Sequence, residues 1–142
     1  MIITFFGHSD FVKTSELEEK MMSVLQSLVA DEPAELFFGG YGSFDRFALE
    51  CGKRYKREHP NVKLSLVIPY LNRGLDNSEG CDEIIYPPIE DTPPRFAISK
   101  RNQWMVEQAD SIVAYVNRSV GGAFKALQYA RRKNKPITNL AE

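Results

Sequence analysis

The sequence lacks most features of secreted, membrane-spanning and nucleic-acid-binding proteins. Its two cysteines, Cys51 and Cys81, are too few for a disulfide framework and do not have metal-ligand spacing. No apolar run approaches the roughly 20 residues that a membrane-spanning helix needs. The formal net charge of −1 gives no general attraction to nucleic acid or to anionic membranes. We therefore predict no metal site, no membrane partner and no nucleic-acid partner.

The start of the chain also lacks a secretion signal. The segment MIITFF is too short for the apolar region of a signal peptide and has no basic residue before it. We therefore expect a cytoplasmic protein, in which Cys51 is a buried free thiol. The 142 residues, 43% of them apolar, suffice for one hydrophobic core. With no repeat or linker visible, we predict a single domain over residues 1–142.

Short apolar runs alternate with amphipathic segments along most of the chain. Apolar runs without polar alternation are typical of parallel strands that are covered on both faces. The alternation with helices predicts an α/β fold, Rossmann-like, with a mostly parallel sheet and helices on both faces. Residues 72–80 are expected to form a surface loop, and the proline-rich residues 88–96 an irregular one. Strands are predicted at 2–6, 34–38, 62–70, 83–88, 110–117 and 135–140, and helices at 14–30, 44–58, 98–109 and 121–134.

The stretch LFFGGYGSFDRFALE has three glycines in four positions, Gly39, Gly40 and Gly42, between a strand and a helix. A second pair, Gly121 and Gly122, separates the fifth strand from the last helix. Ligands of open parallel sheets bind beyond the carboxyl ends of the strands. At that edge two helix N-termini would present unpaired N–H groups, which suit phosphate. We interpret the glycines as places where a phosphate or ribose approaches the backbone.

Other polar residues follow the strands at the same predicted edge, and basic residues begin the third helix. A single glycine-rich turn is commonly structural, and this one matches neither the dinucleotide-binding fingerprint nor the P-loop. Two such turns on one edge favour a ligand site. No catalytic residue can be assigned, although Asp45 and Arg101 are candidates. The predicted ligand-binding residues are Gly7, His8, Ser9, Gly39, Gly40, Tyr41, Gly42, Ser43, Asp45, Pro69, Arg95, Lys100, Arg101, Asn117, Ser119, Gly121, Gly122 and Lys125.

Three stretches resemble the SLOG superfamily, named for the DprA/Smf DNA-processing proteins and the Lonely Guy phosphoribohydrolases. They are FFGHSD, FFGGYGSFDRFA and SKRNQWMVEQADSIVAYVNRSVGGAFKAL. The chain looks most similar to the small stand-alone bacterial members, such as the YpsA-like proteins. This resemblance implies a Rossmann-like domain that binds a nucleotide or nucleotide-derived ligand. It also implies a homodimer, since family members commonly pair through helices.

Lonely Guy enzymes cleave the N-glycosidic bond of a nucleoside monophosphate, using an arginine and a glutamate in the motif P-G-G-x-G-T-x-x-E. By this resemblance Arg101 or Lys100 matches the basic position, and Gly121 and Gly122 match the paired glycines. Val120, Phe124 and Lys125 depart from the motif, and Gln128 stands where the glutamate is expected. An amide cannot transfer a proton or stabilise an oxocarbenium-like centre. Asp45 or Glu50 would have to replace the missing carboxylate.

Several functions are compatible with this pattern. The first is a sensor or regulatory protein that binds a nucleotide or nucleotide sugar, with no certain cofactor beyond it. The second is an N-glycosidic hydrolase acting on such a molecule, in which Arg101 holds phosphate and Asp45 acts on the ribose or the glycosidic bond. A DNA-handling protein is the third, against which the absence of a dense basic stripe argues. The fourth is a scaffold whose glycine-rich edge binds nothing.

Overall fold

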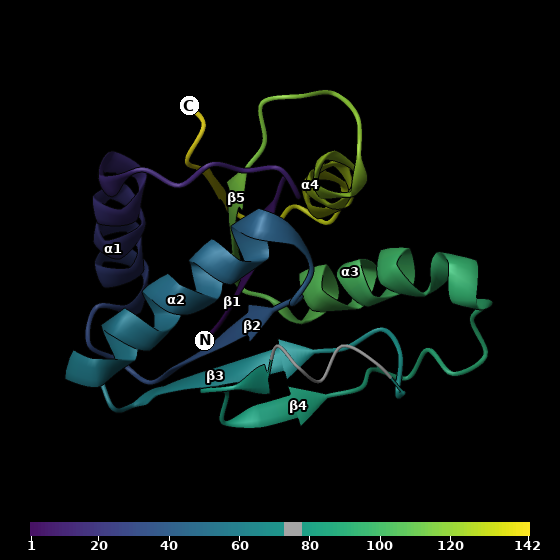
Figure 1. Cartoon of the computed structure of the whole chain (residues 1–142), viewed down its shortest axis with the longest axis horizontal. Helices are drawn as coiled ribbons and strands as arrows, with labels where there is room; N and C mark the ends of the chain where they lie inside the picture. Colours follow the sequence, from purple (N-terminus) through teal and green to yellow (C-terminus); the bar gives the residue numbers. More distant parts are fainter. Residues whose placement is uncertain (73–77) are drawn as a thin grey trace.

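The computed structural model describes residues 1–72 and 78–142 of the chain. All six strands pair in parallel in one sheet, in the order β4-β3-β2-β1-β5-β6. Figure 1 shows β2, β3 and β4 side by side and pointing the same way. The strands are β1 (Ile2–Gly7), β2 (Ala34–Phe38), β3 (Val62–Val67), β4 (Glu83–Ile85), β5 (Ser111–Tyr115) and β6 (Ile137–Asn139). The α-helices are α1 (Ser15–Val29), α2 (Gly42–Glu58), α3 (Ala97–Gln108) and α4 (Gly122–Arg132).

Helices cover both faces of this sheet, so the predicted α/β fold is confirmed. Successive strand residues point to opposite faces. Phe5 and Phe38 belong to the core under α1 and α2, and their rings stack with centroids 4.9 Å apart. Phe6 and Phe37 belong to the core under α3 and α4. The apolar residues on the two faces of the strands thus supply two separate cores.

Several elements differ from the predictions, in their ends or in the residues that they bury. Ser15 and Glu18 have the spacing of a capping box, which predicts Ser15 as the N-cap of the first helix. The N-cap of α1 is instead Thr14, whose hydroxyl accepts the N–H of Leu17 at 3.1 Å. Residues 88–96 are not wholly irregular, because Pro94–Phe96 forms a 3-10 helix, η2, with a proline at its start, where no N–H is needed. The loop predicted at 72–80 lies partly outside the described residues. None of the helices in the described part of the chain is long and apolar enough to span a membrane.

The inner face of α3 also differs from the prediction. The pattern predicts an inner face of Ile98, Asn102, Met105, Val106 and Ala109. Met105, Val106 and Ala109 are buried as predicted, but Ala97 and Arg101 are buried in place of Ile98 and Asn102. Ile98 is 38% exposed and Arg101 only 2%. A hydrophobicity pattern assigns an arginine to the surface by default, and this one is buried because strand-end carbonyls accept its hydrogen bonds.

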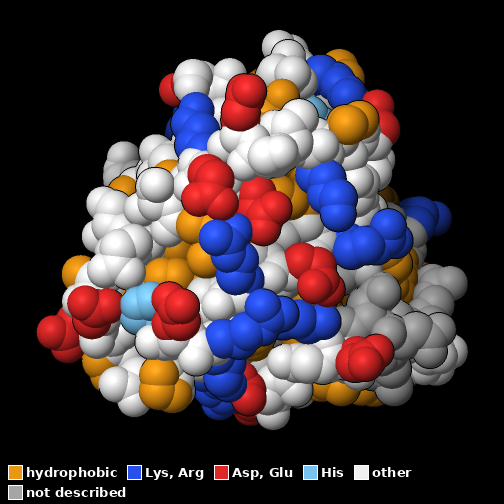
Figure 2. Space-filling model, turned by 60° about the vertical axis from the view of Figure 1, so that its left-hand side comes forward, with side chains coloured by type: hydrophobic (Ala, Val, Ile, Leu, Met, Phe, Trp, Pro, Cys, Tyr) orange, Lys and Arg blue, Asp and Glu red, His pale blue; other side chains and the backbone are white. Residues whose placement is uncertain are grey.

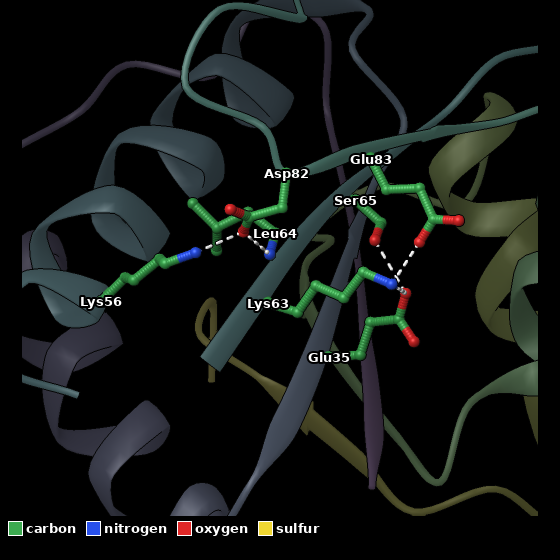
Figure 3. Close-up of polar contacts among 7 residues, drawn as sticks. All are labelled: Glu35, Lys56, Lys63, Leu64, Ser65, Asp82 and Glu83. Carbon is green, nitrogen blue, oxygen red and sulfur yellow. Dashed lines mark hydrogen bonds and ion pairs between the residues drawn. The ribbon is translucent and has the colours of Figure 1, made fainter. Parts of the chain in front are cut away.

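The edge strand β4 is held by charged side chains near the amino ends of the strands (Figure 3). Asp82 accepts the N–H of Leu64 at 2.8 Å and pairs with Lys56. Lys63 lies between Glu35 of β2 and Glu83 of β4. These ion pairs tie β4 to β3 and α2. They lie at the opposite end of the sheet from the glycine-rich turns.

Candidate functional site

The order of the strands places a crevice between β1 and β5. From β1 the chain adds β2, β3 and β4 on one side, and then returns to place β5 on the other side of β1. Ligands of open α/β sheets bind where the strand order reverses in this way. A pocket of about 290 Å³ lies there, beyond the carboxyl ends of the two strands. This β1–β5 pocket is lined by Phe5, Phe6, Gly7, His8, Ser9, Gly39, Tyr41, Asp45, Ile98, Arg101, Asn102, Arg118, Val120, Gly121, Gly122 and Ala123.

The N-terminus of α4 opens into this pocket. Its N-cap is Gly121, with a positive φ of 97° that disfavours side chains, and no side chain caps the first turn. A Cβ added at Gly121 or Gly122 would meet no atom within 4 Å. The first turn of a helix has N–H groups without intrahelical partners. Gly121 and Gly122 are both exposed, so no side chain of their own covers the backbone donors of this turn.

The N-terminus of α2 is closed by the protein itself. The N–H of Tyr41 donates to Asp45 Oδ2 at 2.8 Å, and the N–H of Ser43 donates to the carbonyl of Ser9 at 3.0 Å. A Cβ on Gly42, whose φ is 87°, would lie 2.8 Å from the Cα of Ser9. Gly42 therefore lets the β1 loop approach the helix. The two glycine-rich turns, predicted to act alike, have different neighbours: protein at α2 and open space at α4.

Gly39 leaves room for two charged side chains. A Cβ at this position would lie 3.0 Å from Asp45 Oδ2 and 3.3 Å from Arg101 Cζ. Arg101 Nη1 donates to the carbonyls of Gly39 at 2.7 Å and Val67 at 2.8 Å. Its Nε donates to Asn102 Oδ1 at 2.9 Å. Arg101 thus joins the ends of β2 and β3 to α3, and its charge lies in the pocket wall beside Asp45.

The carboxyl of Asp45 titrates close to neutral pH. Desolvation raises its pKa from the ordinary 3.8 to about 6, against the opposing effects of the Tyr41 N–H and the charge of Arg101. A carboxyl with a pKa near 6 exchanges its proton readily at physiological pH. Asp45 is the one acidic side chain among the described residues that line the pocket. Glu50, the other candidate carboxylate, lies outside the pocket and pairs with Lys53.

This pKa predicts a pH-dependent effect of the substitution Asp45→Asn. Because the folded protein binds the Asp45 proton more tightly than the unfolded chain does, the contribution of Asp45 to stability is greatest below about pH 4. That contribution falls as the pH rises from about 4 to about 6, and stays constant above. We expect Asp45→Asn to be more stable than the wild type at pH 8, on the order of 1–3 kcal/mol, and similar at pH 4. Urea unfolding at pH 4, 6 and 8 measures this, and an equal difference at all three contradicts it.

His8 connects the two loops that flank the pocket. Its side chain is buried, and Nε2 accepts the N–H of Asn117 at 3.0 Å. This hydrogen bond requires the neutral tautomer with its proton on Nδ1. His8 therefore holds the loop after β5 against the loop after β1. Asn117, also predicted in the site, contributes this N–H donor to the link.

The structure adds residues that the sequence reasoning missed. Arg118 lines the pocket and pairs with Asp10 at 2.6 Å across the two loops. Hydrogen bonding to Arg118 lowers the pKa of Asp10, which stays ionised. Asn102 also lines the pocket, next to Arg101. The signal for Arg118 was its place in the loop after β5, whereas Asn102 was assigned to the core.

The predicted site residues fall into four groups. Nine line the β1–β5 pocket: Gly7, His8, Ser9, Gly39, Tyr41, Asp45, Arg101, Gly121 and Gly122. Two more, Gly40 and Gly42, line a neighbouring depression that shares Tyr41 and Asp45. Arg95 and Lys125 line a groove between α3 and α4 together with Gln128. Pro69, Lys100, Asn117 and Ser119 do not line the pocket, and the hydroxyl of Ser43 donates to the carbonyl of Phe11.

Comparison with known proteins gives a distant relative and several structural neighbours. No family model matches the chain. The SPbeta prophage-derived protein YoqJ of Bacillus subtilis strain 168 is 26% identical over 139 residues, which cover 82% of this chain and 81% of that protein.

Solved structures match almost the whole chain at low identity. The protein TM1055 has a TM-score of 0.61 and 16% identity, over 96% of this chain and 71% of that one. The molybdenum cofactor binding protein of Rippkaea orientalis has a TM-score of 0.64 and 19% identity, over 96% of this chain and 73% of that one. DNA processing protein A of Helicobacter pylori, described for its single-stranded DNA binding mode, has a TM-score of 0.61 and 14% identity. The match covers 96% of this chain and 63% of that one.

The chain shares the fold of these three solved structures. The resemblance predicted from the glycine-rich stretches is thereby confirmed for the fold. Identities of 14–19% carry no residue roles from one protein to another. The function has to be argued from the pocket of this chain.

Proposed function

We propose that the chain binds a nucleotide or a nucleotide-derived small molecule in the β1–β5 pocket, as a sensor or regulatory binding protein. The observation that carries this proposal is the open N-terminus of α4 at Gly121 and Gly122. Uncovered N–H groups and the positive end of the helix dipole attract a phosphate. The first turn of α4 has no acidic side chain that would occupy this position instead.

The other lining groups suit the sugar and the base of such a ligand. The carboxylate of Asp45 and the amide of Asn102 can hydrogen-bond ribose hydroxyls. Tyr41 is 36% exposed and presents an aromatic ring on which a base can stack. The volume of about 290 Å³ is at the lower end of the range of small-molecule sites, which favours a compact nucleotide moiety inside it. Pairing of two copies into a homodimer stays a prediction.

A second candidate, N-glycosidic hydrolysis, is favoured by one observation. Asp45 lies in the pocket wall with a pKa of about 6, within the range that suits proton transfer at neutral pH. Against it, Gln128 is an exposed amide that lines the α3–α4 groove rather than the pocket. A hydrolase built on this chain would therefore depend on Asp45 for its carboxylate.

A thermal-shift screen with nucleoside mono-, di- and triphosphates, NAD, ADP-ribose, cyclic nucleotides and a single-stranded oligonucleotide tests the proposal. A ligand at 100 times its Kd stabilises the fold by about 2.7 kcal/mol, or several degrees. We expect a small nucleotide to raise Tm and to be recovered intact by chromatography. Recovery with the base released identifies the hydrolase, and Asp45→Asn would then keep the affinity and lose turnover. No shift by any nucleotide, or a shift by the oligonucleotide alone, overturns the proposal.

A further inference from the structure

The β1–β5 pocket continues into a second hollow between α3 and α4. This α3–α4 groove has a volume of about 400 Å³. It shares Ile98, Asn102 and Gly122 with the β1–β5 pocket, so both hollows meet at the N-terminus of α4. Its lining residues are Arg95, Ile98, Ser99, Asn102, Gln103, Gly122, Lys125, Ala126, Gln128, Tyr129 and Arg132. A molecule with a phosphate at α4 can therefore extend along this helix.

The groove carries positive charge without matching negative charge. Arg95, Lys125 and Arg132 line it, and no carboxylate does among the described residues. None of these three cations occurs in the ion pairs that the described residues form. Two of them lie over aromatic rings, Arg95 over Phe96 at 4.8 Å and Arg132 over Tyr129 at 5.6 Å. These contacts hold the guanidinium groups at the groove without neutralising them.

The surface of α1 and α2 differs from the α3–α4 groove, because cations there form ion pairs with carboxylates. Figure 2 shows Lys and Arg side chains interspersed with Asp and Glu on the side of α1 and α2. There Arg54 pairs with Glu18 at 2.9 Å and with Glu19 at 3.2 Å. A depression of about 550 Å³ on this side is larger than the groove, but Glu18 and Glu50 line it together with the cations. Cations in the α3–α4 groove differ in having no such partners.

The cations are spaced along α4 from the phosphate position outward. With a rise of 1.5 Å per residue, Lys125 lies about 4.5 Å along the axis from Gly122, and Arg132 about 15 Å. Lys125 is within one turn of the open N-terminus, and Arg132 is at the far end of the helix. The groove thus offers positive charge at more than one distance from a phosphate bound at Gly122.

We infer that the α3–α4 groove binds a second anionic group of the ligand, which makes the ligand a nucleoside diphosphate or a derivative of one rather than a mononucleotide. This inference rests on the proposed function, because it requires the first phosphate at the N-terminus of α4. Ser99, Gln103 and Gln128 add neutral hydrogen-bonding groups along the groove. Such groups suit the hydroxyls of a second sugar, as in ADP-ribose.

The test compares 5′-monophosphates of adenosine, guanosine, cytidine and uridine with the matching 5′-diphosphates and with ADP-ribose, by isothermal titration calorimetry on the full chain. In the wild type we expect one diphosphate compound to bind at least tenfold more tightly than its monophosphate. The double variant Lys125→Gln/Arg132→Gln should lose that gain and keep the monophosphate affinity within twofold. Arg131→Gln is the matched control, since Arg131 lies on the same helix but does not line the groove.

The possible results separate this inference from the proposed function. The inference that the groove binds a second anionic group is wrong if mono- and diphosphates bind with equal affinity. It is also wrong if the double variant keeps the higher affinity for the diphosphate. In both cases the proposed nucleotide site is unaffected. Absence of binding by every compound overturns both. A fall in monophosphate and diphosphate affinity by the same factor also overturns the inference, because Lys125 and Arg132 would then act on the first phosphate or on the fold. Thermal unfolding of each variant without ligand shows whether the fold is intact.

Discussion

Substitution of Gly122 by glutamate is expected to lower the affinity for a phosphorylated ligand at least 100-fold, in a protein that stays folded. The new carboxylate would lie at the N-terminus of α4, where the proposed phosphate binds. Since a Cβ at Gly122 meets nothing within 4 Å, the side chain has space and the core is undisturbed. The fold itself should gain stability, because an acidic residue in the first turn of a helix contributes about 0.3–1 kcal/mol. Loss of binding together with higher stability is a result that simple unfolding cannot produce.

The matched control is Gly122→Ala. Alanine adds only a methyl group in the same open space and is a better helix former than glycine by about 1 kcal/mol. We expect both variants to be at least as stable as the wild type, and only the glutamate variant to lose the ligand. Thermal unfolding without ligand and a titration with the strongest nucleotide of the screen measure the two effects. If the glutamate variant binds as well as the alanine variant, the phosphate is not at α4.

The comparison of α4 with α2 shows how far the sequence of a glycine-rich turn predicts a ligand site. Both turns follow a strand and begin a helix, and both predict backbone N–H groups at the carboxyl edge of the sheet. Their sequences do not tell which atoms lie where the missing side chains would be. At Gly42 those atoms belong to Ser9, thirty-three positions earlier in the chain, whereas at Gly122 there are none. Local sequence therefore predicts the conformation of such a turn, and tertiary packing determines whether a ligand can reach it.

The fold was more predictable than the site, because apolar runs alternate with amphipathic segments along most of the chain and together indicate the fold. Mostly apolar runs indicate the central strands. The spacing of Phe44, Phe47, Ala48, Cys51 and Tyr55 places these residues on one face of α2, and all five are buried there. Burial of Arg101 could not be read in this way. Its partners are the backbone carbonyls of Gly39 and Val67, and a sequence does not show which backbone carbonyls will lie near a given side chain.

Removal of the Arg101 side chain is expected to be the most destabilising of the substitutions considered. Arg101→Ala would leave the carbonyls of Gly39 and Val67 without their donor in a buried place. A buried polar group without a partner costs about 1–3 kcal/mol, and the lost side chain also leaves a cavity. Allowing for water entry from the adjoining pocket, we expect a loss of about 3 kcal/mol, or roughly 10 °C in Tm for a chain of this size. Urea and thermal unfolding at pH 7 measure it.

Two further substitutions test whether Arg101 stabilises the fold through its hydrogen bonds or through its charge. Lys100→Ala is the matched control, because Lys100 is the neighbouring exposed cation and its removal should change stability by less than about 0.5 kcal/mol. Arg101→Lys keeps the charge but replaces a planar fork by a point donor. If positive charge beside Asp45 were all that mattered, lysine would restore the stability of the wild type. Because Nη1 bridges the ends of two strands while Nε reaches Asn102, we expect lysine to recover less than half of the loss. Full recovery with lysine would show that the bridge between β2 and β3 is dispensable and that Arg101 acts through its charge on the pocket.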